Sequence, residues 1–290
     1  MKEEYRRYLH EGQVAGSHYA LVVPRNVPRG VTGAQMGMGV GSSLEFMDHR
    51  EYQPGDDLRR INWNAYARTD RLTVKMYREE VNPHVDIVLD GSRSMALPET
   101  PKVHAALALA AVFAESGANA GYRTCSWITG SWCERIHNGT ERAAFWEAID
   151  FDSKTNPGQA LSRMQGRFAA QGMRVFISDL LWLGDPLVCL NRLAQKASSV
   201  FVIQLLTRAD VQSSSRGNIR LVDSETNETK ELFIDAATGK RYQQRLTEHQ
   251  NNWHRACTQV GALMTTLIAD DVVDRWHLDE LVATEILQVL

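Results

Sequence analysis

The sequence lacks any long run of apolar residues. Its longest apolar segments are interrupted by charged or polar side chains, well short of the roughly 20 residues that cross a bilayer. Residues 1–20 carry charged side chains such as Lys2, Glu3 and Arg6, where a signal peptide needs an apolar stretch. We therefore expect a cytoplasmic protein with no membrane span.

An excess of positive charge is also missing. The formal net charge is -3 and the sequence pI is about 6.3. No overall positive field is available to attract nucleic acid or an acidic membrane. We therefore expect partners of another kind.

Cysteine is scarce, and its spacing matches no metal motif. Cys125, Cys133, Cys189 and Cys257 contain no CxxC pair, so a zinc site is not indicated. We expect reduced, mostly buried thiols, although Cys125 and Cys133 could face each other across a hairpin. HExxH, GxxxxGK[ST] and GxSxG are absent too, so the sequence indicates neither a P-loop ATPase nor a serine nucleophile on an elbow.

After residue 80, short apolar runs alternate with amphipathic stretches. This alternation is typical of strands and crossover helices in a mostly parallel sheet. Strands are predicted at 85–89, 122–128, 132–136, 173–178, 200–206 and 263–268. Helices are predicted at 103–116, 141–149, 157–168, 186–197, 242–260 and 278–289, with a small surface hairpin near 219–235.

The first 80 residues lack that alternation. Strands are predicted at 19–23 and 72–77, with glycine-rich and charge-rich chain between them. The glycine run from Gly33 to Ser43 is not flanked by the strand and helix that a dinucleotide-binding fingerprint needs, so we interpret it as a loop. The sequence thus predicts a β-rich N-terminal region, 1–80, packed on an α/β domain, 81–290.

Candidate metal ligands follow the first strand of the α/β domain. Asp90, Ser92 and Ser94 alternate in a short loop directly after that strand. Ligand sites of open α/β sheets form at the carboxyl ends of strands, and one carboxylate with two hydroxyls suits Mg²⁺ or Mn²⁺. The alternative is that both serines only cap the backbone before the next helix.

Two later residues favour the metal site. Asp179 follows the strand 173–178, so we expect it at the same edge of the sheet as Asp90. Thr155 lies in the loop before the helix that opens at Pro157, where its hydroxyl could complete the set.

This combination resembles the metal-ion-dependent adhesion site of von Willebrand factor A domains, which has a DxSxS loop, a loop threonine and a strand-end aspartate. The resemblance covers about residues 81 to 210. It implies a von Willebrand factor A-like fold whose divalent cation is held by Asp90, Ser92, Ser94, Thr155 and Asp179. One coordination position would then remain open. A carboxylate of a partner protein would fill it, because a cation with few protein charges around it stays electrophilic and prefers an acidic ligand.

A longer signature lies in the N-terminal region. The segments LEF at 44–46, REYQPGDD at 50–57 and RINW at 60–63 resemble the bacterial DUF58 family. Met95, Ser178-Asp179 and the segment around Asp223 are similar to that family as well, so the resemblance spans most of 40–270. Members are usually encoded beside MoxR-type AAA+ ATPases. The resemblance therefore implies a partner or adaptor of such an ATPase, or a protein that binds its client.

A metal-dependent hydrolase or phosphotransferase that uses the Asp90 loop is the alternative function. The common phosphoaspartate enzymes carry a second carboxylate two residues after the first, where this chain has Ser92. Asp179 is the only candidate for a general base, and the predicted metal already uses it. We therefore expect a binding module and not an enzyme.

Basic side chains gather in the N-terminal signature around Trp63, as they do in proteins that bind nucleic acid. The arginines are Arg50, Arg59, Arg60, Arg68 and Arg71. Acidic residues are interleaved with them, namely Glu45, Asp48, Glu51, Asp56, Asp57 and Asp70. This mixture favours internal ion pairs, or an acidic protein partner, over nucleic acid.

Overall fold

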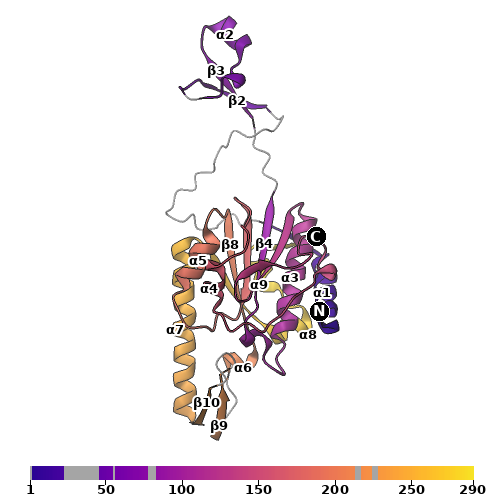
Figure 1. The fold of residues 1–290 in the computed structure, drawn as a ribbon, viewed down its shortest axis with the longest axis vertical. Coiled ribbons are helices and arrows are strands. Elements are labelled where there is room, and N and C mark those ends of the chain that lie inside the picture. The colour runs from indigo at the N-terminus through magenta and orange to yellow at the C-terminus, as the bar shows by residue number, and fades with distance from the viewer. Residues whose placement is uncertain (1, 23–45, 55, 78–82, 213–216, 224–227) are drawn as a thin grey trace. The chain divides into compact units, whose positions relative to one another are not determined.

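The chain forms two units in the computed structural model, which describes residues 2–22, 46–54, 56–77, 83–212, 217–223 and 228–290 (Figure 1). The larger unit contains residues 1–31 and 83–290, and the smaller unit contains residues 32–82. The change of unit near residue 82 lies close to the predicted boundary at 80. Residues 1–31 belong to the larger unit, whereas the sequence prediction assigned them to the N-terminal region.

A six-stranded sheet forms the centre of the larger unit, with strands in the order β11-β8-β7-β4-β5-β6. Every neighbouring pair is parallel except β5 and β6, which form the predicted hairpin. This confirms a mixed α/β fold with a mostly parallel sheet. The strands are β4 His84–Asp90, β5 Arg123–Thr129, β6 Cys133–Arg135, β7 Met173–Ser178, β8 Ser199–Leu206 and β11 Leu263–Ile268.

Helices cover both faces of this sheet, so successive strand residues enter opposite cores. Ile87 and Leu89 of β4 belong to one core, whereas Val88 belongs to the other. The first core is covered by α1 Glu3–Gly16, α3 Lys102–Asn119, α8 Ala269–Arg275 and α9 Asp279–Ala283. The second is covered by α4 Pro157–Ser162, α5 Pro186–Ala194 and α7 Ala236–Val260. Figure 1 shows α5 and α7 on one side of β4 and β8, and α1 and α3 on the other.

The N-terminal helix α1 was not predicted, because its apolar residues are few and its charged residues many. Leu9 is fully buried against α3, and Gly12 lies so close to that helix that a Cβ atom there would come within 2.1 Å of the Ala108 carbonyl oxygen. The strand β1 Tyr19–Leu21 then pairs antiparallel with β12 Leu287–Val289. The segment that follows α1 is thereby joined to the last strand of the described chain.

Three helix predictions are wrong in extent or in kind. Residues 141–149 contain only the 3-10 turn η3 Ala143–Phe145, and the helix at Pro157 ends at Ser162. The C-terminal helix ends at Ala283, because Glu285 has a positive φ of 57° and the chain continues as β12. Ile286 is therefore buried in the bend after α9 and Leu287 in the strand β12, although their spacing also fits a helix.

The hairpin predicted near 219–235 is confirmed as β9 Gly217–Val222 paired with β10 Thr229–Ile234. It follows α6 Arg208–Val211 and precedes α7. All four cysteines are buried and free, as predicted, but Cys133 pairs with Thr129 across the β5–β6 hairpin and not with Cys125. Burial raises the pKa of the Cys133 thiol to about 12.

The smaller unit contains an antiparallel pair, β2 Phe46–Glu51 and β3 Thr73–Tyr77, with the turn η1 Leu58–Arg60 and the helix α2 Trp63–Thr69. Arg50 pairs with Asp56, and Arg59 pairs with Asp57 at 3.0 Å. These two contacts are internal ion pairs of the predicted kind. The glycine run at 33–43, Leu44, Glu45 and the side chains of Asp48 and Arg60 lie outside what the structure describes.

Across the described ranges, no helix is both long enough and apolar enough to span a membrane.

Candidate functional site

Two carboxylates lie at the carboxyl edge of the sheet, where adjacent parallel strands end. Asp90 is the last residue of β4, and Asp179 follows the last residue of β7. The two strands are hydrogen-bonded neighbours in register, with Leu89 opposite Ile177. Both aspartates are fully buried. The shared edge on which the sequence prediction depended is therefore present.

The loop after Asp90 is shaped by short contacts with its own carboxylate. The Ser92 amide donates to Oδ1 of Asp90 at 2.9 Å, and the Ser178 hydroxyl donates to Oδ2 at 2.6 Å. Gly91 packs on the next strand, where an added Cβ atom would lie 2.4 Å from the Thr129 carbonyl oxygen. These contacts turn the chain so that the Ser92 and Ser94 hydroxyl oxygens lie 3.0 Å apart.

The segment that carries Thr155 runs alongside this loop. Ser92 and Ser153 form a parallel bridge, in which the Arg93 amide donates to the Ser153 carbonyl and the Ser153 amide to the Gly91 carbonyl. Thr155 is half-buried, and its amide donates to the Ser153 hydroxyl at 3.0 Å. The bridge therefore places the segment that contains Thr155 next to the Asp90 loop. Ser153, which forms the bridge, was not singled out from the sequence.

Arg93 lies between the two serines, and its guanidinium Nε donates to the Asp152 carbonyl oxygen at 3.0 Å. The side chain thus fastens the two loops to each other.

A lysine that sequence analysis did not single out completes the cluster. Lys102 is the first residue of α3, and its side chain is 1% exposed. Its Nζ lies 3.0 Å from Oδ2 of Asp179 and 3.0 Å from Oδ2 of Asp210 in α6. Burial by itself lowers the pKa of Lys102, but the two carboxylates outweigh burial and raise it. The ammonium is therefore charged at neutral pH.

The electrostatics of Asp90 are unfavourable for a carboxylate. Burial, followed by the charge of Asp179, raises the pKa of Asp90 to about 7, against hydrogen bonds from Ser178 and Ser92 that lower it. A cation beside the two carboxylates would remove this penalty. With all groups ionised, the three aspartates and Lys102 carry a net charge of minus two, which one divalent cation would neutralise.

The donors suit only a small, hard cation. Among the residues that the structure describes, no group of three or more His, Cys, Asp or Glu is arranged to hold a metal. A site here would instead combine the Asp90 and Asp179 carboxylates with serine hydroxyls, which are the oxygen ligands of Mg²⁺ and Mn²⁺. The residues fit such an ion in chemistry, with serine hydroxyls available beside the two carboxylates.

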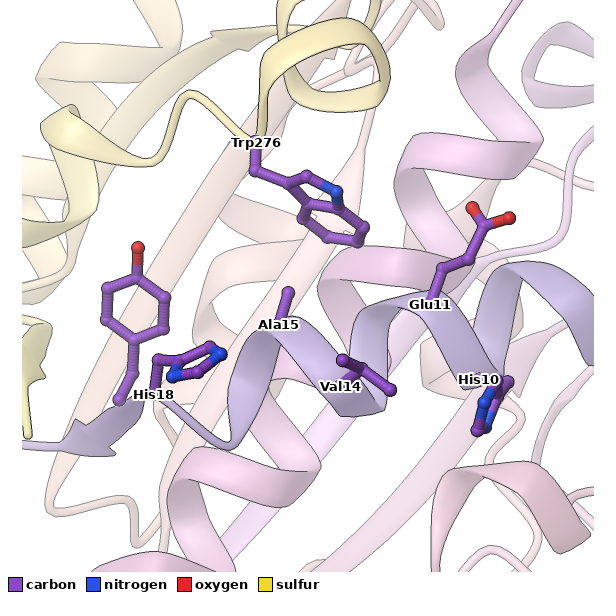
Figure 2. A pocket seen from close by; sticks show the side chains of 7 residues that line it. His10, Glu11, Val14, Ala15, His18 and Trp276 are labelled. Atoms are coloured by element: carbon purple, nitrogen blue, oxygen red, sulfur yellow. The ribbon is translucent and has the colours of Figure 1, made fainter.

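A surface groove of about 520 Å³ lies apart from this cluster (Figure 2). It is bordered by α1 residues, among them Glu11 and Val14, and by Trp276, and its walls are mostly apolar. The groove shares no residue with the carboxyl-edge cluster. The chemistry-bearing residues and the hollowed surface are therefore separate features of the larger unit.

Comparison with known proteins identifies relatives. The model of a family described as "Protein of unknown function DUF58" matches residues 48–252. Uncharacterized proteins of Mycobacterium bovis and Mycobacterium tuberculosis are each 26% identical over 264 residues, covering 86% of this chain and 82% of the relative.

Two solved structures are weakly similar. The conserved hypothetical protein BatB of Bacteroides thetaiotaomicron matches with a TM-score of 0.36 and 10% identity, covering 70% of this chain and 98% of that one. An aerotolerance-related membrane protein of Bacteroides fragilis matches with a TM-score of 0.34 and 10% identity, covering 66% and 94%.

Proposed function

The chain belongs to the DUF58 family, and we propose that it is a divalent-cation-dependent protein-binding module, with an α/β unit of the von Willebrand factor A type. The observation that carries this proposal is the convergence of the Asp90 loop, Ser153–Thr155 and Asp179 at one edge of the sheet. Their oxygen atoms suit Mg²⁺ or Mn²⁺. The raised pKa of Asp90 supports the proposal, because a bound cation would offset the repulsion between the buried carboxylates.

In this proposal, Asp90, Ser92 and Ser94 hold the ion, and Thr155 and Asp179 assist them. The cation would supply an electrophilic centre that accepts a carboxylate from a partner protein. Other residues of the chain position the groups that would hold the ion. Arg93 and Ser153 hold the two loops together, and the Ser178 hydroxyl fixes the Asp90 carboxylate by donating to its Oδ2.

The partner that we propose is a MoxR-type AAA+ ATPase, or a client protein of that ATPase. This assignment rests on the family resemblance. We propose no nucleic-acid ligand, since the net charge is negative and two arginines of the signature already pair with aspartates.

Cation binding is tested directly with the purified protein. Titration calorimetry with Mn²⁺ and Mg²⁺ should show saturable binding to the wild type and none to Asp90→Ala. Glu248→Gln, which removes an exposed carboxylate on α7, is the matched control and should bind as the wild type does. Equal binding of the ions by the wild type and Asp90→Ala would contradict the proposed ion site at Asp90.

Partner binding is tested by capture of a purified MoxR-type ATPase on immobilised protein. Capture is expected with Mg²⁺, and it should be lost in EDTA and in Asp90→Ala. Capture that is unaffected by both changes would contradict a role for the ion. Phosphate-ester hydrolysis that disappears in Asp90→Ala would favour the metal-dependent hydrolase instead.

A further inference from the structure

Two effects disfavour a charged lysine at position 102, namely the helix dipole and burial. It is the first residue of α3, where the helix dipole is positive and repels a cation. Its side chain is 1% exposed, although transfer of an ammonium from water into a protein interior is costly. Side chains that break local rules in this way concentrate at functional sites.

The compensation comes from two carboxylates in the segments that follow two adjacent strands of the sheet. Asp179 follows β7, and Asp210 lies in α6, which follows the adjacent strand β8. Each carboxylate places an Oδ2 atom 3.0 Å from Nζ of Lys102. The ammonium therefore stands where three segments of the carboxyl edge meet, and it uses an oxygen of a candidate metal ligand.

The other oxygen of Asp179 is also in use, because its Oδ1 accepts from the Leu181 amide at 3.0 Å. Asp210 is fixed independently of Lys102. Its side chain closes a capping box with Thr207, and its carbonyl accepts from the Tyr242 hydroxyl at 2.6 Å. Asp210 is thus a fixed anchor for the ammonium, whereas Asp179 is shared between the ammonium and the candidate metal site.

We propose that Lys102 is a built-in competitor of the divalent cation, holding the Asp179 carboxylate while no ion is bound and setting a low affinity for the ion. The proposal rests on the proposed function, since it assumes that the cation binds beside Asp90 and Asp179. A bound ion must share Asp179 with an ammonium that repels it. Ion binding is thereby coupled to the contact between α3 and the carboxyl edge.

The test compares wild type and Lys102→Met, which keeps an unbranched side chain of nearly the same length and removes the ammonium. Lys102→Met should bind Mn²⁺ at least about tenfold more tightly in titration calorimetry, because the repulsion between the ammonium and the ion is gone. Without metal it should unfold at a lower temperature than the wild type, and saturating Mn²⁺ should restore most of that loss. A purely structural lysine would lower the unfolding temperature without raising the affinity for Mn²⁺.

Two further variants keep the inference testable if Lys102→Met fails to fold. Asp210→Asn leaves the ammonium with Asp179 alone, so Mn²⁺ should bind more weakly than to the wild type. The double variant Lys102→Met with Asp210→Asn has the wild-type net charge and should still bind more tightly than Asp210→Asn. Lys240→Met, an exposed lysine on α7, is the matched control and should change neither quantity.

The outcomes separate this inference from the proposed function. If wild-type binding depends on Asp90 but Lys102→Met and Asp210→Asn bind with unchanged affinity, the competitor role is wrong and the ion site stands. If the wild type binds no Mn²⁺ while Lys102→Met does, and Asp90→Ala abolishes that binding, Lys102 excludes the ion and the cation-dependent function fails.

Discussion

At the scale of single residues, the candidate site depends on a backbone that approaches its neighbour closely. Gly91 lies between Asp90 and Ser92, and its amide donates to the Thr129 carbonyl at 3.1 Å. A side chain at this position has no space, because its Cβ atom would lie 2.4 Å from that carbonyl oxygen and 2.9 Å from Ile128. The path of the loop that carries Ser92 and Ser94 therefore depends on glycine at position 91.

Gly91→Ala should destabilise the protein by about 1 to 3 kcal/mol, since overpacking of a buried position costs that much. Urea unfolding followed by circular dichroism measures the change. The control is Gly239→Ala in α7, where a Cβ atom would meet nothing within 4 Å. Alanine there should raise stability by about 0.5 to 1 kcal/mol. A Gly91→Ala protein as stable as the wild type would show that the loop is looser than described.

The raised pKa of Asp90 predicts a pH dependence of stability in the absence of metal. The pKa of about 7 lies above the ordinary value of 3.8, so the folded state binds the proton more tightly than the unfolded state. The favourable contribution is present below pH 3.8 and is lost as the pH rises through about 7. Between pH 4 and 8 in EDTA, the wild type should lose stability relative to Asp90→Asn, which cannot ionise. A constant difference between the two proteins over this range would disprove the shift.

At the scale of elements, α1 shows how a polar helix becomes part of a core. Four of its residues are buried, namely Tyr5, Leu9, Gly12 and Gly16. Two of the four are glycines that let α1 approach α3 within backbone contact. The helix α3 can accept this contact because it is apolar nearly all round, with 13 of its 18 residues buried. Packing, and not local propensity, therefore holds α1 in place.

Leu9→Ala should cost about 2 to 5 kcal/mol, the usual range for truncation of a fully buried leucine. Val14→Ala on the same helix is the control, because Val14 is 53% exposed and its loss should have little effect. Thermal unfolding of the two variants checks the contrast. Similar unfolding temperatures for both would mean that α1 is not docked on α3.

At the scale of the whole larger unit, the strand pair β1–β12 joins residues about 270 positions apart in the sequence. Tyr19, Ala20 and Leu21 pair with Val289, Gln288 and Leu287. Leu287 and Leu21 are both buried, so the pair belongs to the same core as α1 and α3. The first and last described segments therefore stabilise each other.

Leu287→Ala should loosen β1 and α1 together, although neither is altered. Amide hydrogen exchange should become faster throughout residues 3–22, because their packing and pairing share one core. Val289→Ala, whose side chain is 60% exposed, should leave this exchange unchanged. Faster exchange confined to residues 284–290 would contradict the coupling.

Sequence patterns predicted the strands of the central sheet well, because a buried parallel strand is a continuous apolar run in the sequence, bounded by turns. The segment 173–178 matches β7 to the residue, and 263–268 matches β11. The patterns failed at 141–149 and at 278–289. Residues 141–149 enter the core with only a 3-10 turn, and the last helix stops at Ala283, after which Leu287 enters the core from a strand. The spacing of a short apolar segment does not distinguish these outcomes from a helix.

The sequence by itself determined the composition of the candidate site at its centre: Asp90, Ser92 and Ser94 in one loop, and Asp179 after a strand that must end at the same edge. Only the tertiary structure decided that Lys102 and Asp210 join them. Their contact depends on where α3 and α6 lie relative to the sheet, and no local pattern encodes a distance between side chains 108 positions apart. The site is therefore one in which acidic groups predicted from the sequence share their edge with a buried ammonium that only the fold reveals.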